Sequence, residues 1–356
     1  MQDRCLTFVG FLAVAAAPLL PATAMAQASK PALKTAPDAW TLPRTSDGQP
    51  DFQGVWANNN ATPLERPKEL EGRSSLTDDE VAAMRQRAAE LFGGDGDAAF
   101  GDEVFRTVFA GIKESGAGPH KKGTKDFDAD TGDYSSVWIV ARDWDNRTSL
   151  ITDPPDGKMP AMTDEGKQRG AAVAAALARP PAGPKDRTLS ERCITYGSPQ
   201  LLAGYQSYYR IVQTRDAVVI ATEMIHDARV VPLDAGPHVS SNIQQWRGDS
   251  RGHWEGDTLV VDSTNYKPRS FMSSSDKLHV IERFSRVGPA TLNYEVTIDD
   301  PETWTKPWTL MIPLRQSADE VFEYACQEGN SGMAGILAGA RAEERAAAAS
   351  PKPSSK

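Results

Sequence analysis

Hydrophobic and polar residues alternate repeatedly along the second half of the chain, with the two-residue period of a strand that has one buried face. Short turn-rich stretches separate the alternating runs, and Glu255-Gly256-Asp257 is the clearest hairpin signal among them. The runs cover residues 205–212, 217–224, 258–263, 278–284, 291–298, 308–314 and 321–326. Consecutive strands at this spacing predict a mainly β protein whose antiparallel sheet closes into a barrel.

The first half of the chain carries the start signals of two helices instead. Thr77 is a candidate N-cap and Glu80 completes a capping box, which predicts a helix through residue 92. A second helix, capped by Thr163, is expected at about residues 163–178. These segments precede the main sheet, so we expect them to be insertions into a single β domain.

The connections in this half are rich in glycine and charged residues. We expect a helical insertion at about residues 64–133, of which residues 93–133 would be mobile. Short strands are predicted at 136–142 and 147–152. Residues 27–49 are predicted to be a disordered lead-in, 50–342 the single barrel domain, and 343–356 a disordered tail.

The first 26 residues have the pattern of an export signal. Arg4 precedes a short apolar core, and Ala24-Met25-Ala26 has the form of a cleavage site. Apolar runs elsewhere fall short of the roughly 20 residues that a bilayer-spanning helix needs. The sequence therefore predicts a periplasmic or secreted protein without membrane insertion.

Cysteine content and net charge indicate which covalent cross-link and which partners to expect. Of the three cysteines, Cys5 lies in the predicted signal, which leaves Cys193 and Cys326 either as one disulfide or as two buried thiols. An oxidising compartment favours the disulfide. The formal net charge of −9 makes nucleic acid a poor partner. The oligomeric state is left open.

The polar segment between two predicted strands holds the candidate catalytic residues Glu223, His226, Asp227 and Arg229. An imidazole beside a carboxylate can act as a general base near neutral pH, and an arginine can stabilise developing negative charge. The alternative is a charged loop that hydrogen-bonds to its own turns. A metal site is a variant hypothesis, since His226 and His238 with Asp227 or His279 could supply ligands, but their spacing matches no compact metal motif. We therefore expect no metal.

Other side chains on the predicted barrel are candidate ligand contacts. Glu282 alternates with the apolar residues of its strand, so it should be buried and paired, with Arg210 and Arg283 as the expected partners. Inward aromatic residues would form a pocket for a flat apolar molecule. The candidate ligand-binding set is Tyr209, Arg210, His238, Trp246, His279, Glu282 and Tyr294.

Several long sequence blocks resemble a known group of proteins. The blocks RTSLITDPPDGKMP, MIHDARVVPLD, QWRGDSRGHWEGDTLVVDSTN and FEYACQEGN resemble signature segments of a family of exported bacterial proteins, most without an assigned function. The resemblance covers most of residues 50–342. It implies export and, by analogy with G-x-W strands such as the one ending at Trp56, a lipocalin-like (calycin) barrel.

Several common enzyme motifs are missing from the sequence, which has no P-loop, dinucleotide fingerprint or C-x-x-C. Two hypotheses follow. The first is a cofactor-independent enzyme of lyase, isomerase or hydrolase type acting on a small hydrophobic or aromatic molecule. The second is a non-catalytic periplasmic binding protein of lipocalin-like type for small hydrophobic ligands.

Overall fold

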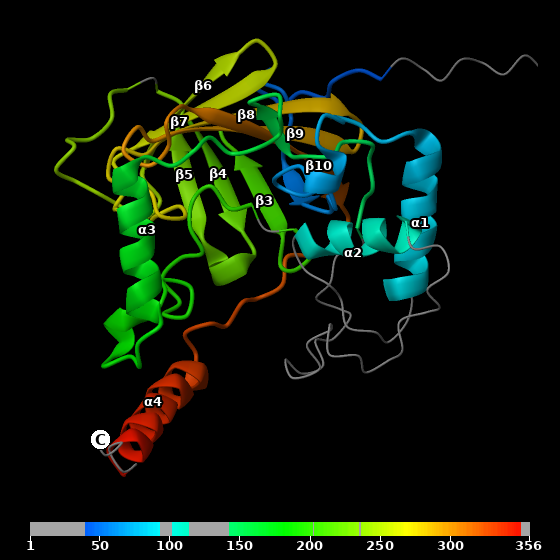
Figure 1. The fold of residues 1–356 in the computed structure, drawn as a ribbon. Coiled ribbons are helices and arrows are strands. Elements are labelled where there is room, and N and C mark those ends of the chain that lie inside the picture. The colour runs from blue at the N-terminus through cyan, green and yellow to red at the C-terminus, as the bar shows by residue number, and fades with distance from the viewer. Residues whose placement is uncertain (1–39, 93–101, 114–141, 202, 235, 350–356) are drawn as a thin grey trace, which may run out of the picture. The chain divides into compact units, whose positions relative to one another are not determined.

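A single ten-stranded antiparallel sheet dominates the computed structural model, which describes residues 40–92, 102–113, 142–201, 203–234 and 236–349. The strand order is β5-β4-β3-β1-β10-β9-β8-β7-β6, and β2 pairs with β10 outside this path. The strands are β1 (Gly54–Ala57), β2 (Ile151–Asp153), β3 (Tyr208–Gln213), β4 (Ala217–Thr222), β5 (Ala228–Pro232), β6 (Asp249–Glu255), β7 (Thr258–Thr264), β8 (His279–Gly288), β9 (Thr291–Asp299) and β10 (Trp308–Ser317). The predicted mainly antiparallel β fold is confirmed (Figure 1).

The two edge strands of the sheet, β5 and β6, approach each other without a backbone ladder between them in the described residues. Their contact is made by side chains instead. A Cβ atom on Gly252 of β6 would lie 2.8 Å from Val231 Cγ1 of β5 and 2.8 Å from Leu233 Cδ2. Glycine at this position therefore allows close packing of the two edges, although the sheet path itself stays open.

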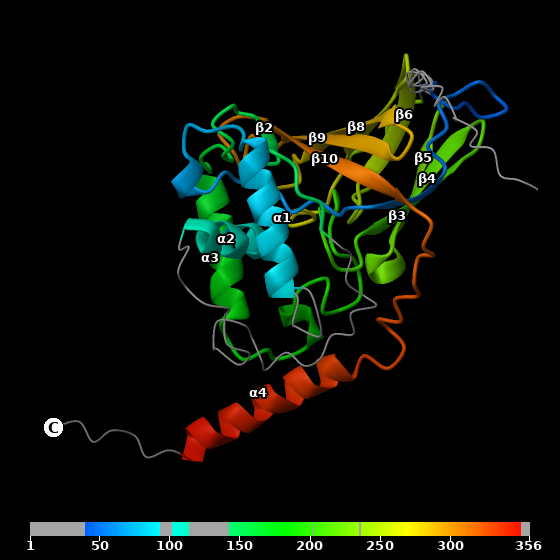
Figure 2. The same ribbon diagram turned by 90° about the vertical axis from the view of Figure 1, so that its right-hand side faces the viewer.

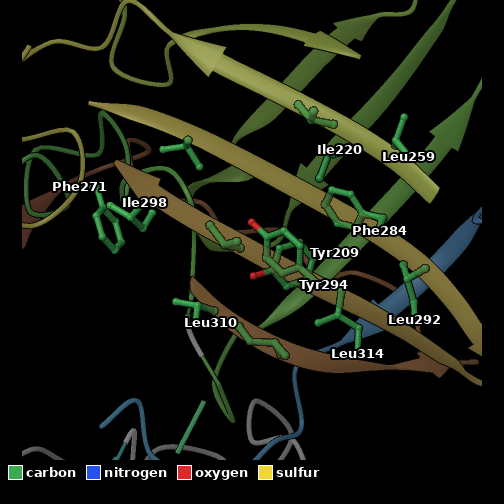
Figure 3. Packing of buried hydrophobic residues seen from close by; sticks show 14 of the residues in the cluster. Tyr209, Ile220, Leu259, Phe271, Phe284, Leu292, Tyr294, Ile298, Leu310 and Leu314 are labelled. Carbon is green, nitrogen blue, oxygen red and sulfur yellow. The ribbon is translucent and has the colours of Figure 1, made fainter. Parts of the chain in front are cut away.

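The inner face of the sheet carries the main core, as the alternation predicted. Inward residues of β8 to β10 are almost fully buried, among them Phe284, Tyr294 and Leu310. Figure 3 shows Tyr209 of β3 and Tyr294 of β9 meeting in this interior, although their strands belong to different parts of the sheet. Trp56 of β1 is 0% exposed and its indole N–H donates to the Phe52 carbonyl at 2.7 Å.

Two helices, α1 (Asp78–Phe92) and α2 (Asp102–Lys113), pack together outside the sheet (Figure 2). The predicted capping box of α1 is present, since Glu80 N donates to Thr77 Oγ1 at 3.2 Å and Thr77 N donates to Glu80 Oε2 at 2.8 Å. α2 corrects the prediction of a mobile stretch at 93–133. Its apolar residues recur at helical spacing and are buried against α1: Val104, Phe105, Val108 and Phe109.

The other two helices are α3 (Asp164–Leu177), which begins after the predicted N-cap Thr163, and α4 (Ser331–Ala349). α4 extends well into the tail that was expected to be disordered from residue 343. Its alanine-rich sequence has high helix propensity, and Arg341 donates to the Pro181 carbonyl at 2.8 Å. Among the described helices, none is long and apolar enough to cross a membrane.

Three local predictions were wrong. The segment after Asp227 is a strand, β5, and not a loop, because Arg229 and Val231 alternate inward while Val230 points out. Residues 321–326 form no strand, because their backbone N–H groups bond to side chains of another segment. The strand predicted at 147–152 is shorter in the structure and corresponds to β2. Residues 136–141 of the other predicted strand lie outside the described residues.

The lead-in prediction is also corrected for the part that the structure describes. Residues 40–49 form a turn in which Thr45 N donates to the Gln49 carbonyl at 2.8 Å. Arg44 then reaches Asp257 in the β6–β7 turn at 2.8 Å. The segment is therefore fixed on a hairpin of the sheet, while residues 27–39 and the predicted export signal lie outside the described residues.

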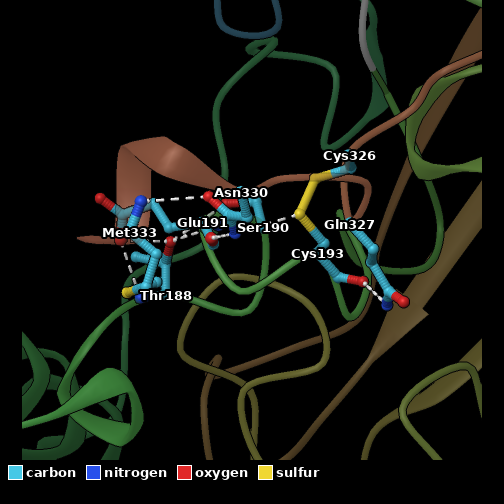
Figure 4. Close-up of a disulfide and its surroundings, with 8 residues drawn as sticks. All are labelled: Thr188, Ser190, Glu191, Cys193, Cys326, Gln327, Asn330 and Met333. Atoms are coloured by element: carbon cyan, nitrogen blue, oxygen red, sulfur yellow. Dashed lines mark hydrogen bonds between the residues drawn. A yellow bond between two sulfur atoms is a disulfide. The ribbon is translucent and has the colours of Figure 1, made fainter. Parts of the chain in front are cut away.

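The predicted disulfide between Cys193 and Cys326 is present, with a Cα–Cα distance of 5.6 Å (Figure 4). Neighbouring side chains hold both ends of the bridge. Gln327 Nε2 donates to the Cys193 carbonyl at 3.0 Å, and Asn330 Nδ2 donates to the Glu191 carbonyl at 2.9 Å. The bridge therefore joins the segment before β3 to the segment after β10.

We predict that the mature protein, denatured without reductant, contains no free thiol. The bridge joins two cysteines that are 133 residues apart in the sequence. A loop of that length corresponds to about 5 kcal/mol in the chain-entropy model, which is an upper figure. Replacing both cysteines by serine should therefore lower the free energy of unfolding by several kcal/mol, measured by urea titration. Two titratable thiols in the untreated protein would contradict the prediction.

Candidate functional site

A buried ion pair between Arg229 and Glu282 is the centre of the polar interior. Arg229 Nη1 lies 2.5 Å from Glu282 Oε2, and Nη2 lies 2.7 Å from Oε1, so the contact is bidentate. The two side chains are 6% and 0% exposed. Burial lowers the pKa of Arg229, but the charge and hydrogen bonds of Glu282 outweigh it, so that the pKa is raised overall. The guanidinium is therefore a permanent cation within the core.

Strand geometry explains why these two residues meet. On β8, Glu282 falls between the inward residues Val280 and Phe284, as the sequence predicted. The expected partners were wrong, however. Arg283 alternates outward and pairs with Glu255 at 2.5 Å, and Arg210 is exposed on the outer face of β3. Arg229 pairs with Glu282 instead, because its side chain points inward from β5.

Three tyrosines surround the ion pair. Tyr294 donates its hydroxyl hydrogen to Glu282 Oε1 at 2.6 Å, and Tyr209 donates to the Gln200 carbonyl. Burial, reinforced by the negative charge of Glu282, raises the pKa of both tyrosines. Burial likewise raises the pKa of Tyr266 to about 12. All three hydroxyls are therefore protonated donors at neutral pH.

A second arginine, Arg247, extends the cluster. Burial lowers the pKa of Arg247, and the nearby positive charge of Arg229 lowers it further. The counter-ion of Arg247 is Asp227, with Nη1 at 3.2 Å from Oδ1. Thr195 donates its hydroxyl hydrogen to the other oxygen of Asp227 at 2.6 Å. Two guanidinium groups thus face two carboxylates, and the cluster has no net charge.

Several buried polar atoms of this cluster lack a hydrogen-bond partner among the described residues. They include Arg229 Nε and Arg247 Nε. The Tyr266 hydroxyl lies within hydrogen-bond influence of Ser198 and Ser263 and in the field of Arg229 and Glu282. Buried polar groups in folded proteins are normally satisfied by protein, water or ligand. The two Nε–H groups can each donate to a further acceptor.

The predicted catalytic segment does not assemble as expected. His226 is exposed, and its Nε2 accepts the backbone N–H of Tyr324 at 2.9 Å. Asp227 is committed to Arg247 and Thr195, so the structure does not bring it together with His226. Glu223 is 1% exposed, and its Oε1 accepts the Phe322 N–H at 3.0 Å. Of the four candidates, Asp227 and Arg229 reach the interior cluster.

The predicted ligand-binding set divides between the two faces of the sheet. Tyr209, Glu282 and Tyr294 belong to the buried cluster. Four others lie outside it: Arg210, His238, Trp246 and His279. Lys267 Nζ lies 5.0 Å from the ring centroid of Trp246.

The two outer histidines share one carboxylate. His238 Nε2 and His279 Nε2 lie 3.2 and 3.0 Å from Asp262 Oδ1. The hydrogen bond with Asp262 raises the pKa of His279. Within the residues that the structure describes, no group of three histidine, cysteine or acidic side chains is arranged to hold a metal ion. His238, His279 and Asp262 therefore form an ion-paired network near the surface.

Sequence reasoning missed Arg247, Tyr266, Ser198 and Thr195. They lie in connections, where no alternation reports which way a side chain points. Tyr266 lies two residues after the end of β7, and a continued alternation would have placed it on the outer face with Asp262 and Thr264, so the sequence pattern did not indicate its burial.

Comparisons with known proteins add little to this geometry. No family model matches the chain, and no curated protein matches it. One solved structure is similar, a single-site mutant of the fluorescent protein UnaG, with 11% identity and a TM-score of 0.21. The match covers 45% of this chain and 93% of that chain.

We predict that Glu282→Gln lowers the free energy of unfolding by about 3–5 kcal/mol, because it leaves the Arg229 cation buried without a counter-ion. Urea titration would measure the loss. Glu295→Gln on the neighbouring strand β9, whose side chain points outward, is the matched control and should change stability little. The double variant Arg229→Met with Glu282→Leu should recover most of the loss. Equal stability of Glu282→Gln and the control would contradict a buried charge pair.

We predict that Glu223→Gln is more stable than the wild type near neutral pH. Burial raises the pKa of Glu223, so the folded state holds this proton more tightly than the unfolded state. The resulting stability is present at low pH and is lost as pH rises through the raised pKa. Because Glu223 Oε2 is also buried and unpaired, the gain from glutamine should be on the order of 1 kcal/mol.

Urea titrations of both proteins between about pH 4 and about pH 7 would test this. The stability difference should grow as pH rises. A difference that is constant across this range, or that grows as pH falls, would contradict the assignment.

Proposed function

We propose that this protein is an exported, non-catalytic binding protein whose sheet works as a lipocalin-like barrel around a small hydrophobic or aromatic molecule. The single observation that carries the proposal is the pair of buried donors Arg229 Nε–H and Arg247 Nε–H, which have no hydrogen-bond partner among the described residues. The packing of β5 against β6 around Gly252 supports the barrel. The resemblance of several sequence blocks to exported proteins of unassigned function supports the compartment.

The donors favour a ligand with an oxygen acceptor. A carbonyl or phenolic oxygen can take hydrogen bonds from a guanidinium Nε–H and from hydroxyl groups at the same time. Because the two arginines are already balanced by Glu282 and Asp227, a neutral ligand fits the cluster better than a multiply charged anion. A full negative charge would have to compete with the existing counter-ions.

The surroundings of the cluster are aromatic. Phe284 stacks on Tyr294 with ring centroids 4.6 Å apart, and Tyr209 meets Tyr294 at 6.0 Å. Flat rings of this kind make favourable stacked and edge contacts with aromatic molecules. An apolar body with one oxygen at its end would therefore satisfy both the rings and the donors.

Access to the cluster requires movement of the segment that covers it. Tyr209 is bonded to the backbone at Gln200, and Ser198 is 1% exposed, so residues 198–200 lie over the donors. A binding step that displaces packed backbone is slower than docking to an open surface. We expect association rate constants below about 10⁵ M⁻¹s⁻¹.

A cofactor-independent enzyme is the second candidate, and one observation favours it. Tyr266, with a pKa of about 12, lies in the field of the permanent cation Arg229, and a protonated hydroxyl beside a cation can act as a general acid. His226 is the less suitable group, because it is exposed and its Nε2 is occupied by a backbone N–H.

We predict that Tyr266→Phe, which removes only the hydroxyl, weakens binding of a carbonyl-bearing aromatic or terpenoid ligand about 3- to 10-fold. The measurement is a screen of such compounds by thermal shift, followed by titration calorimetry on the wild type and the variant. Tyr196→Phe is the matched control, since Tyr196 is 44% exposed, and it should bind as the wild type does.

His226→Ala separates the two candidate functions. A binding protein should retain its ligand affinity in this variant and convert no compound. Product formation by the wild type that disappears in His226→Ala would overturn the binding proposal. Product formation that survives in His226→Ala and disappears in Tyr266→Phe would support the tyrosine-based enzyme instead.

A further inference from the structure

A solvent-open hollow of about 210 Å³ lies apart from the buried cluster. Four separate parts of the chain line it: the turn at residues 45–49, Gln53 before β1, the β3–β4 turn at Gln213, and Trp254 with Leu233 beside β5 and β6. A volume of this size exceeds the space of a single water many times over. It is suited to a molecule with about ten to twelve non-hydrogen atoms.

The wall of the hollow is held in place by bonds that do not involve a ligand. Gln213 Oε1 accepts the Phe52 N–H at 2.6 Å, while its Nε2 donates to the Pro50 carbonyl at 2.9 Å. The ion pair between Arg44 and Asp257 anchors the neighbouring turn to the β6–β7 hairpin. These contacts fix the shape of the hollow in advance of binding.

The groups that remain free in the hollow are polar and mostly uncharged. In the described part of the chain, the side chains of Asp47, Gln49 and Gln53 make no hydrogen bond. They offer one carboxylate acceptor and two amides, each of which can donate and accept. Leu233 supplies an apolar surface beside them.

Trp254 is the most informative lining residue. Its ring rests on Phe52, with centroids 5.4 Å apart, so its position is fixed by packing. Its indole nitrogen is buried, so Trp254 lines the hollow with its ring and not with its N–H group.

We propose that this hollow binds a neutral polyhydroxylated molecule of monosaccharide size. Such a molecule has many hydroxyl groups that both donate and accept, which matches the two amides and the carboxylate. Its C–H faces pack on flat aromatic and aliphatic surfaces such as Trp254 and Leu233. Anions are disfavoured, because Asp47 is the charged group that the hollow presents.

The proposal is independent of the function assigned to the buried cluster, because the two sites share no lining residue. The hollow is open and is built from groups at the ends of strands. An open polar site of this size should bind weakly and fast, with dissociation constants in the range of about 1–10 mM.

The experiment titrates the mature protein with D-glucose, D-galactose, D-mannose and myo-inositol, read by tryptophan fluorescence and by protein-observed NMR. At least one compound should bind and shift resonances of Gln53 and Trp254. Trp254→Phe, which reduces the flat ring surface against which the C–H face of the sugar packs, should weaken that binding about 3- to 10-fold. Gln53→Ala should weaken it by a similar factor.

Trp246→Phe is the matched control, because Trp246 contacts Lys267 and does not line the hollow. It should bind as the wild type does, and circular dichroism should show the same fold for all variants. The proposal is overturned if none of the four compounds binds at about 50 mM, well above the expected constants. It is also overturned if Trp254→Phe and Gln53→Ala bind as tightly as Trp246→Phe.

Discussion

The ion pair between Arg229 and Glu282 is the contact on which the arrangement of the interior depends. It joins β5 to β8, two strands that the sheet path separates by β4, β3, β1, β10 and β9. Because β5 and β6 share no backbone ladder in the described residues, side chains must hold the two ends of the sheet together. A desolvated pair is costly unless its geometry is good and its remaining lone pairs are satisfied. The bidentate contact and the hydroxyl of Tyr294 meet that condition for Glu282.

The same pair determines the chemistry that the interior can offer. Glu282 accepts one hydrogen bond from each terminal nitrogen of Arg229, and the Nε–H group is a further donor without a partner among the described residues. Asp227 balances Arg247 in a similar way, so the cluster is neutral but rich in hydrogen-bond donors. The tyrosines stay protonated because burial disfavours their anions. On the proposed binding function, these donors would orient an oxygen acceptor of the ligand.

Much of the fold was predictable from the sequence, because alternation reports directly which face of a strand is buried. Glu282 and Tyr294 were placed inside for this reason, and the Thr77–Glu80 capping box and the N-cap Thr163 located α1 and α3. The partner of Glu282 was not predictable, since pairing across the interior depends on how distant strands are brought together. β5 was missed because His226 and Asp227 gave its start the composition of a loop. Tyr266 and Arg247 lie in connections, where the pattern of the sequence carries no information about direction.

A crystal structure of the mature protein, at a resolution that shows ordered water, would test the central claim most directly. If the interior is a binding site, electron density for a water or a bound molecule should lie within hydrogen-bond distance of Arg229 Nε and Arg247 Nε. The account would be contradicted if protein atoms alone satisfied both donors, because the cluster would then be a closed structural network with no place for a ligand.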